Sequence, residues 1–152
     1  MTVGDTILRV QHLAKHFPVT RGIVFQREIA RLKAVDDVSF EIKAGQTLGL
    51  VGESGCGKST LARCIVRLLE PTAGSIEFQG QDITQLSGSA LRRVRRDLVM
   101  IFQDPMSSLN PRMRVSQVIG EPLEIHEVGT SATRRARVME LLELVGLNPE
   151  HY

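Results

Sequence analysis

Apolar and polar residues alternate along two stretches in the first third of the chain. Residues 7–12 read Ile-Leu-Arg-Val-Gln-His, and residues 38–43 read Val-Ser-Phe-Glu-Ile-Lys. Because successive side chains of a β-strand point to opposite faces, this period of two predicts a strand in each stretch. Residues 18–33 between them show no clear period and mix Gly22 with arginines. We therefore expect a loop or an inserted excursion between the two strands.

Short apolar runs predict further strands. Residues 43–46 read Lys-Ala-Gly-Gln, which is typical of a turn, and the apolar run 47–51 that follows has the length of a buried strand. Residues 98–102 form a second β-rich run, and residues 75–78 form a short strand that Gly80 closes. None of these runs approaches the roughly 18 apolar residues that a membrane-spanning helix needs.

Two helices are predicted in the middle of the chain. The first follows a glycine-rich loop, carries Leu61, Ile65, Leu68 and Leu69 at helical spacing, and is ended by Pro71, which cannot continue a helix. The second is a short basic helix over residues 86–96. Between residues 103 and 111 the chain is expected to form a loop.

Two more helices are predicted toward the C-terminus. Residues 116–125 favour a weaker helix, because Pro122 would kink it. Residues 133–145 favour a strong one, with Gly146 standing where a C-cap is expected. Its apolar stripe consists of Val138, Leu141, Leu142 and Val145.

Composition and charge limit the class of protein. A chain of 152 residues with 42% hydrophobic residues is long enough for one globular domain with an apolar core. Its 19 basic and 17 acidic side chains give a net charge of +2, which does not argue for nucleic acid as a partner. The first ten residues lack the apolar core of an export signal, so we expect a cytosolic chain.

Cysteine and histidine give no sign of a disulfide or a metal site. We expect the two cysteines, Cys56 and Cys64, to be reduced, because both fall in a predicted helix and its leading loop. The histidines lack metal-ligand spacing and are expected at the surface; they are His12, His16, His126 and His151.

One motif carries specific chemistry. Residues 52–59 read Gly-Glu-Ser-Gly-Cys-Gly-Lys-Ser and match the P-loop pattern in full. Its glycines let backbone N–H groups wrap around phosphate oxygens, Lys58 supplies a positive charge, and the Ser59 hydroxyl is a natural Mg²⁺ ligand. A predicted strand precedes the motif and a predicted helix follows it, as phosphate binding requires. This context favours a nucleoside triphosphate site over a glycine-rich turn without a ligand.

Several segments together resemble a known family. Residues 52–60, Pro-Thr-Ala-Gly-Ser-Ile at 71–76, and Phe-Gln-Asp-Pro-Met-Ser-Ser-Leu-Asn-Pro at 102–111 are similar to the ATP-binding subunits of ABC transporters. The last of these, with residues 33–40 and 118–123, resembles the oligopeptide, dipeptide and nickel importers in particular. A DNA-associated ABC-type ATPase or a small P-loop kinase fits less well, since the chain has no Trp and one Tyr, and a kinase would lack the 103–111 loop.

The resemblance implies an α/β fold, that of the N-terminal half of a P-loop ABC ATPase. Residues 1–103 would form the antiparallel β subdomain and part of the RecA-like core, and residues 104–152 the rest of the glutamine loop and the start of the helical subdomain. Leu-Ser-Gly-Gly-Gln, a Walker B strand and a switch histidine are absent from these residues. We therefore expect an N-terminal piece of a longer ATPase, or else a nucleotide-binding module without turnover.

The resemblance also assigns roles to residues. Phe17 would stack on adenine, with Phe25 as a rival; Lys58 and Gln103 would serve catalysis, and Ser59 and Gln103 would hold Mg²⁺. The residues expected to bind ATP are Phe17, Gly52, Glu53, Ser54, Gly55, Cys56, Gly57, Lys58, Ser59 and Thr60.

The expected partners follow from the same resemblance. Residues 103–111 would touch the transmembrane permease subunits, which would keep the chain on the inner face of the cell membrane. A second ATP-binding subunit would pair with this one, and a solute-binding protein would act indirectly. No nucleic-acid partner is expected.

Overall fold

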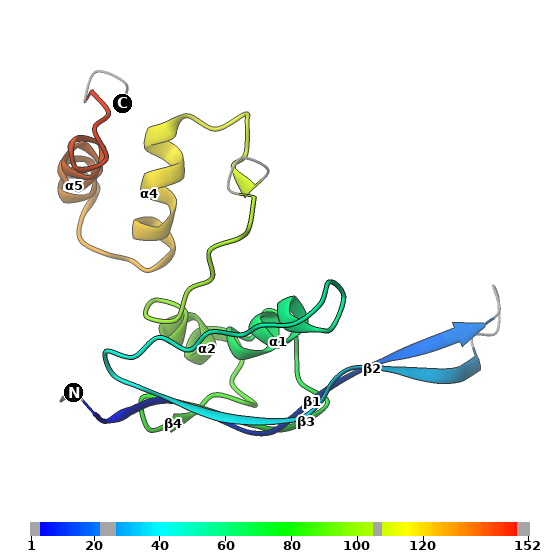
Figure 1. Cartoon of the computed structure of the whole chain (residues 1–152). Coiled ribbons are helices and arrows are strands. Elements are labelled where there is room, and N and C mark those ends of the chain that lie inside the picture. Colours follow the sequence, from blue (N-terminus) through cyan, green and yellow to red (C-terminus); the bar gives the residue numbers. More distant parts are fainter. Residues whose placement is uncertain (1–3, 22–26, 105–107, 149–152) are drawn as a thin grey trace. The chain divides into compact units, whose positions relative to one another are not determined.

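The structure is a computed structural model that describes residues 4–21, 27–104 and 108–148. The chain divides into two compact units, Met1–Met100 and Ile101–Tyr152, here called the first and the second unit (Figure 1). No helix in the described ranges is both long and apolar enough to cross a membrane.

An antiparallel sheet forms the base of the first unit. It has four strands in the order β2-β1-β3-β4, so that β1 lies between β2 and β3. Their bounds are β1 Thr6–Arg21, β2 Arg27–Lys43, β3 Ala73–Phe78 and β4 Gln81–Asp82. The predicted strands at 7–12, 38–43 and 75–78 are confirmed, and the turn at 43–46 is confirmed by a hydrogen bond from the Gln46 N–H to the Lys43 carbonyl.

Residues 18–21 and 27–33, the described parts of the stretch predicted as a loop or excursion, form strands instead; residues 22–26 lie outside the described residues. β1 and β2 continue into this stretch as a two-stranded ribbon, which Figure 1 shows extending beyond β3. Within this ribbon the register shifts once, between Val19 and Thr20, which interrupts the period of two at that point. Pro18 is tolerated because β1 pairs with β3 only up to Ala14, so nothing in the described sheet requires an N–H on that side of Pro18.

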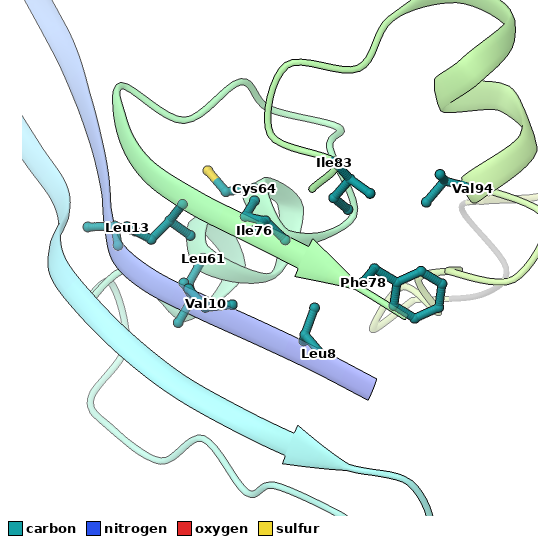
Figure 2. Packing of buried hydrophobic residues seen from close by; sticks show 10 residues of the cluster. Leu8, Val10, Leu13, Leu61, Cys64, Ile76, Phe78, Ile83 and Val94 are labelled. Carbon is teal, nitrogen blue, oxygen red and sulfur yellow. The ribbon is translucent and has the colours of Figure 1, made fainter. Parts of the chain in front are cut away.

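The core of the first unit lies between one face of the sheet and two helices (Figure 2). Helix α1 spans Lys58–Ile65 and helix α2 spans Gly88–Val94. The prediction at 86–96 is thus confirmed in a shorter form. The predicted helix after the glycine-rich loop is shorter than expected: it ends at Ile65, so Leu68 and Leu69 lie outside it, because the backbone at Arg67 adopts a left-handed φ of 57° before Pro71 is reached. The buried residues are Leu8, Val10, Leu13, Val35, Leu61, Cys64, Ile76, Phe78, Ile83 and Val94.

Two predicted strands are absent from the structure. Residues 47–51 and 98–102 have no strand assignment, and several of their apolar side chains are exposed, up to 94% at Val51 and 89% at Ile101, whereas Leu98 and Met100 are half-buried. No strand in the described part of the chain pairs with either segment. Because a strand needs ladder partners for its N–H and C=O groups, an apolar run alone does not make one.

The second unit contains helices α4, Val115–Ile125, and α5, Ser131–Leu144, close to the predicted bounds. Helix α4 runs through Pro122, whose carbonyl accepts a hydrogen bond from the His126 N–H. Helix α5 begins at the Thr130 cap and ends in a Schellman motif, in which the N–H groups of Gly146 and Leu147 donate to Glu143 and Leu142. On α5, Val138 and Leu142 are buried, whereas Val145 lies outside the helix and is exposed.

Candidate phosphate-binding site

The glycine-rich loop connects the extended segment 47–51 to the first turn of α1. It turns at Ser54 and Gly55, where the Cys56 N–H donates to the Glu53 carbonyl at 3.3 Å. Gly55 and Gly57 have φ values of 82° and 97°, in the left-handed region that glycine adopts without steric cost. The local sequence thus produces the tight turn that a phosphate loop requires.

Gly57 also needs to be glycine because of its surroundings. A Cβ atom at this position would lie 2.1 Å from the carbonyl oxygen of Ala34 in β2. At Gly52, a Cβ atom would lie 2.7 Å from the Sγ atom of Cys56. These two glycines let the loop pack closely against the sheet and against itself.

Helix α1 begins at the end of the loop, and no side chain accepts a cap hydrogen bond from its first N–H groups. Its N-cap is Gly57, no side chain caps it, and no acidic residue lies in its first turn. The Leu61 N–H donates to the Gly57 carbonyl at 2.9 Å, so the N–H groups of Lys58, Ser59 and Thr60 precede that intrahelical bond. Such N–H groups and the helix dipole together favour an anion.

The Lys58 ammonium is held at the start of the loop. Its Nζ atom donates to the carbonyl oxygens of Gly52 and Glu53, both at 2.7 Å, and lies 3.6 Å from Cys56 Sγ. The positive charge therefore sits on the same loop as the glycine N–H groups. The loop glycines, the Lys58 ammonium and the start of α1 thus lie on one short segment, and the role of residues 52–60 in binding phosphate stays a prediction.

Phe17 lies on β1, half-buried, in register with Leu32 of β2. The Nζ atom of Lys15 lies 5.0 Å from the centroid of its ring, within cation–π distance. Phe25, the rival aromatic, lies outside the described residues. The adenine-stacking role of Phe17 stays a prediction.

The proposed Mg²⁺ ligands belong to different units. Ser59 is exposed on the first turn of α1, whereas Gln103 is exposed in the second unit, so its role also stays a prediction. In the ranges that the structure describes, no cluster of three or more His, Cys, Asp or Glu side chains could hold a metal ion.

The cysteines and histidines take no part in such a cluster. Cys56 and Cys64 are both free, and burial raises the pKa of the Cys64 thiol, which packs in the core as a neutral group. His12 is exposed as predicted, but His16 and His126 are half-buried; His151 lies outside the described residues.

Sequence reasoning missed two contacts, that of the Ala34 carbonyl with the loop and that of Lys15 with the Phe17 ring. The carbonyl group of Ala34 meets Gly57, and no side-chain pattern could have indicated a backbone contact of this kind. Lys15 stands two positions before Phe17, and this spacing on a strand, which places both side chains on one face, was an available signal.

Comparison with known proteins identifies the family of this loop. The family model described as ABC transporter matches residues 35–152, most of the chain. The chain belongs to the ABC transporter family. The ABC transporter chain is also 51% identical over 146 residues to the oligopeptide transport ATP-binding protein AppF of Bacillus subtilis, a match that covers 95% of this chain and 44% of AppF.

Other relatives carry related names. The di/tripeptide transport ATP-binding protein DppF of Pseudomonas aeruginosa is 44% identical over 97% of this chain and 45% of its own length. The glutathione import ATP-binding protein GsiA of Pectobacterium atrosepticum is 48% identical over 97% of this chain and 24% of its own length. This ABC transporter chain thus spans less than half the length of each of these relatives.

A solved structure confirms the predicted fold. The dimeric ATP-binding cassette MJ0796, bound to ADP and Pi, matches with a TM-score of 0.74 at 25% identity, over 93% of this chain and 58% of its own. The antiparallel sheet and the helices of this ABC transporter chain are those of the N-terminal part of an ABC ATPase fold.

Proposed function

We propose that this chain is an ATP-binding part of an ABC importer for peptides or similar small solutes. The observation that carries the proposal is the loop 52–57, with its left-handed glycines, the Lys58 ammonium and the uncapped start of α1 on one short segment. The names of relatives that carry oligopeptides, di- and tripeptides or glutathione support the class of solute.

The residues present fit ATP with Mg²⁺. Backbone N–H groups of the loop would hold the phosphates, and Lys58 would turn from the loop carbonyls toward the outer phosphates. The hydroxyl of Ser59 would be a ligand for Mg²⁺, which neutralises charge on phosphate oxygens when bound. Phe17 would stack on adenine, and Gln103 would reach the metal and the attacking water.

The expected partners extend the proposal to the whole transporter. The segment 103–111 would contact the permease subunits, and a second ATP-binding subunit would pair with this one. A solute-binding protein would deliver cargo without touching the chain. This arrangement would hold the chain on the cytoplasmic side of the membrane.

Calorimetric titration of the full 152-residue chain with MgATP tests the proposal. Lys58→Ala removes the cation from the loop and should weaken binding by about tenfold or more, the loss expected for charge-assisted hydrogen bonds. Lys43→Ala is the matched control, because Lys43 is an exposed lysine at the end of β2. Equal affinity in the wild type and Lys58→Ala, with both folded in thermal melts, would contradict the proposal.

The same samples separate binding from turnover. Phosphate release that Lys58→Ala abolishes would show that the 152 residues hydrolyse ATP. Binding without phosphate release would instead support the alternative, a nucleotide-binding module without turnover.

A further inference from the structure

An exposed leucine lies beside the aromatic residue of the candidate site. Leu32 of β2 is the register partner of Phe17 in β1, and cross-strand partners share a face of the sheet. Leu32 is 59% exposed, although it stands on the same face of the sheet as the half-buried Phe17. Such a position normally packs against another apolar group.

This face is the one on which α1 packs. Lys15 pairs with Val35, which is only 5% exposed and belongs to the core cluster together with Leu61 of α1. Lys15 and Phe17 stand two positions apart on β1, and the Lys15 ammonium lies over the Phe17 ring. Phe17 and Leu32 therefore lie on the same side of the sheet as the phosphate loop.

The contact between the loop and β2 shows how far Leu32 lies from the phosphate loop. Gly57 approaches β2 at the carbonyl of Ala34, and Leu32 is two residues away on that strand. The register skips Ala34 between Val35 and Lys33, so β2 is irregular there and the two residues span at most roughly 7 Å. In a nucleotide, one ribose separates the phosphates from the base, so a base would lie near this part of the ribbon when its phosphates occupy the loop.

We propose that Leu32 is a nucleobase-contacting residue that, together with Phe17, forms an apolar platform for the base of the nucleotide. This inference rests on the proposed function, because the phosphate loop places the nucleotide. The base stacks on the Phe17 ring and covers the exposed side chain of Leu32. The Lys15 ammonium leaves the ring face and turns toward the phosphates, which are the nearest anions when the nucleotide is bound.

The test compares a nucleotide with a ligand that has phosphates and no base. Affinities of the full chain for MgATP and for magnesium tripolyphosphate are measured for the wild type, Leu32→Ala and Ile29→Ala. Ile29 is the matched control, since it is an aliphatic residue of β2 with 58% exposure and no register partner. Leu32→Ala should weaken MgATP binding roughly fivefold, as expected for loss of a partly buried aliphatic contact, and leave tripolyphosphate binding unchanged.

The outcomes are distinct. Equal MgATP affinity in Leu32→Ala and the wild type, or an equal loss for both ligands, would overturn the role of Leu32. Absence of MgATP binding to the wild type would instead overturn the proposed function. A second measurement does not depend on affinity: intermolecular NOEs between the adenine protons and the Leu32 methyl groups are expected, and NOEs to Phe25 in their place would reject the platform.

Discussion

At the residue scale, Gly57 combines a left-handed backbone with a close approach to β2. Its φ is 97°, and a Cβ atom would lie 2.1 Å from the Ala34 carbonyl oxygen. Gly45 has a similar φ of 80°, but nothing lies within 4 Å of a Cβ atom there. Alanine substitutions at Gly57 and Gly45 therefore separate the cost of a left-handed backbone from the cost of a steric clash.

We predict that Gly57→Ala lowers the free energy of unfolding by about 3 kcal/mol, and Gly45→Ala by about 1 kcal/mol. The first substitution forces the loop away from the sheet. The second costs only the conformational free energy of an alanine at a positive φ. Urea unfolding of the nucleotide-free chain measures both changes from the shift in midpoint. Equal losses would show that the contact between Gly57 and Ala34 does not constrain the loop.

The residues of this loop were predictable because their types carry the chemistry. Glycine at 52, 55 and 57 and the lysine at 58 follow from what a phosphate requires of a backbone and a charge. The contact with Ala34 was not predictable, since a carbonyl oxygen is present at every position of a chain. Leu32 was equally hidden, because only the register of the sheet shows which residue it faces.

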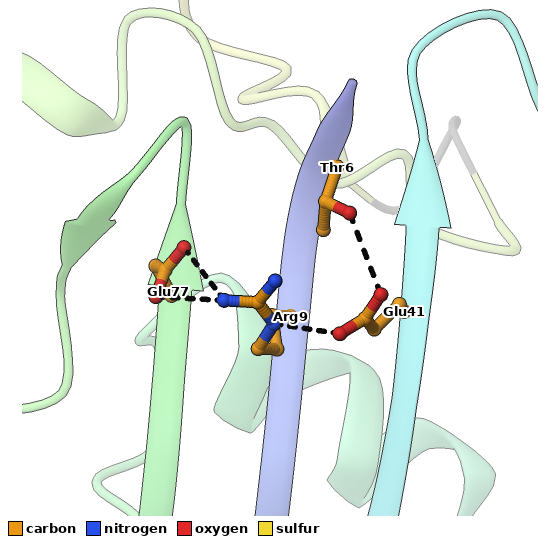
Figure 3. Close-up of polar contacts among 4 residues, drawn as sticks. All are labelled: Thr6, Arg9, Glu41 and Glu77. Atoms are coloured by element: carbon orange, nitrogen blue, oxygen red, sulfur yellow. Dashed lines mark hydrogen bonds and ion pairs between the residues drawn. The ribbon is translucent and has the colours of Figure 1, made fainter. Parts of the chain in front are cut away.

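At the scale of elements, Arg9 joins three strands on the face of the sheet away from the core (Figure 3). Its Nε atom donates to Glu41 of β2 at 2.6 Å, and its Nη1 atom donates to both carboxylate oxygens of Glu77 in β3 at 3.3 Å. Thr6 adds a hydrogen bond to Glu41 at 3.4 Å. The hydrogen bond from Arg9, followed by its charge, holds the pKa of Glu41 below its ordinary value of 4.5.

This contact predicts a dependence of stability on pH. A carboxyl group with a lower pKa in the folded state adds stability above its unfolded pKa, and that stability is lost as the pH falls through the folded pKa. Arg9→Met should therefore flatten the decline in the urea midpoint between about pH 6 and about pH 3. The remaining decline comes from other carboxyl groups with lowered pKa values, Asp36 beside Lys33 and Asp82 beside Thr84.

Arg21→Met is the control for this experiment, because it removes an exposed arginine of β1 that is not bonded to Glu41. Its pH profile should match that of the wild type. A profile of Arg9→Met that also matches the wild type would mean that Arg9 does not set the pKa of Glu41.

The elements divide into those with local signals and those that depend on partners. Helix α5 was predicted closely, because its apolar face and Gly146 after its C-terminus are local signals; the predicted start at 133 lies two residues after Ser131, because the cap at Thr130 was not recognised. The segments 47–51 and 98–102 carry apolar runs, but a strand depends on a ladder that local sequence does not encode. The ribbon over residues 18–21 and 27–33 was missed for a related reason, since the pairing that makes it, which persists through a register shift between Val19 and Thr20, is not visible in the local sequence.

At the scale of the whole molecule, the phosphate loop belongs to the first unit and Gln103 to the second. A ligand that binds the folded loop stabilises the unit that contains it, by about 2.7 kcal/mol when the ligand is present at about 100 times its Kd. The second unit gains stability from the same ligand only if one of its residues makes a contact with it. Added stability of the second unit in the presence of nucleotide would therefore test the proposed role of Gln103.

We predict that saturating MgATP slows hydrogen exchange of buried amides in both units, but to different extents. The amides of Val10 and Ile76, in the core of the first unit, should gain the full protection, and those of Val138 and Leu142 in α5 a smaller part. Gln103→Ala should abolish the gain in α5 and leave the gain in the first unit, because the loop and Lys58 remain intact. Lys58→Ala should reduce both gains at the same MgATP concentration, by about 1.4 kcal/mol of stabilisation for each tenfold loss of affinity. If α5 gains the same protection with and without the Gln103 side chain, then Gln103 does not connect the nucleotide to the second unit.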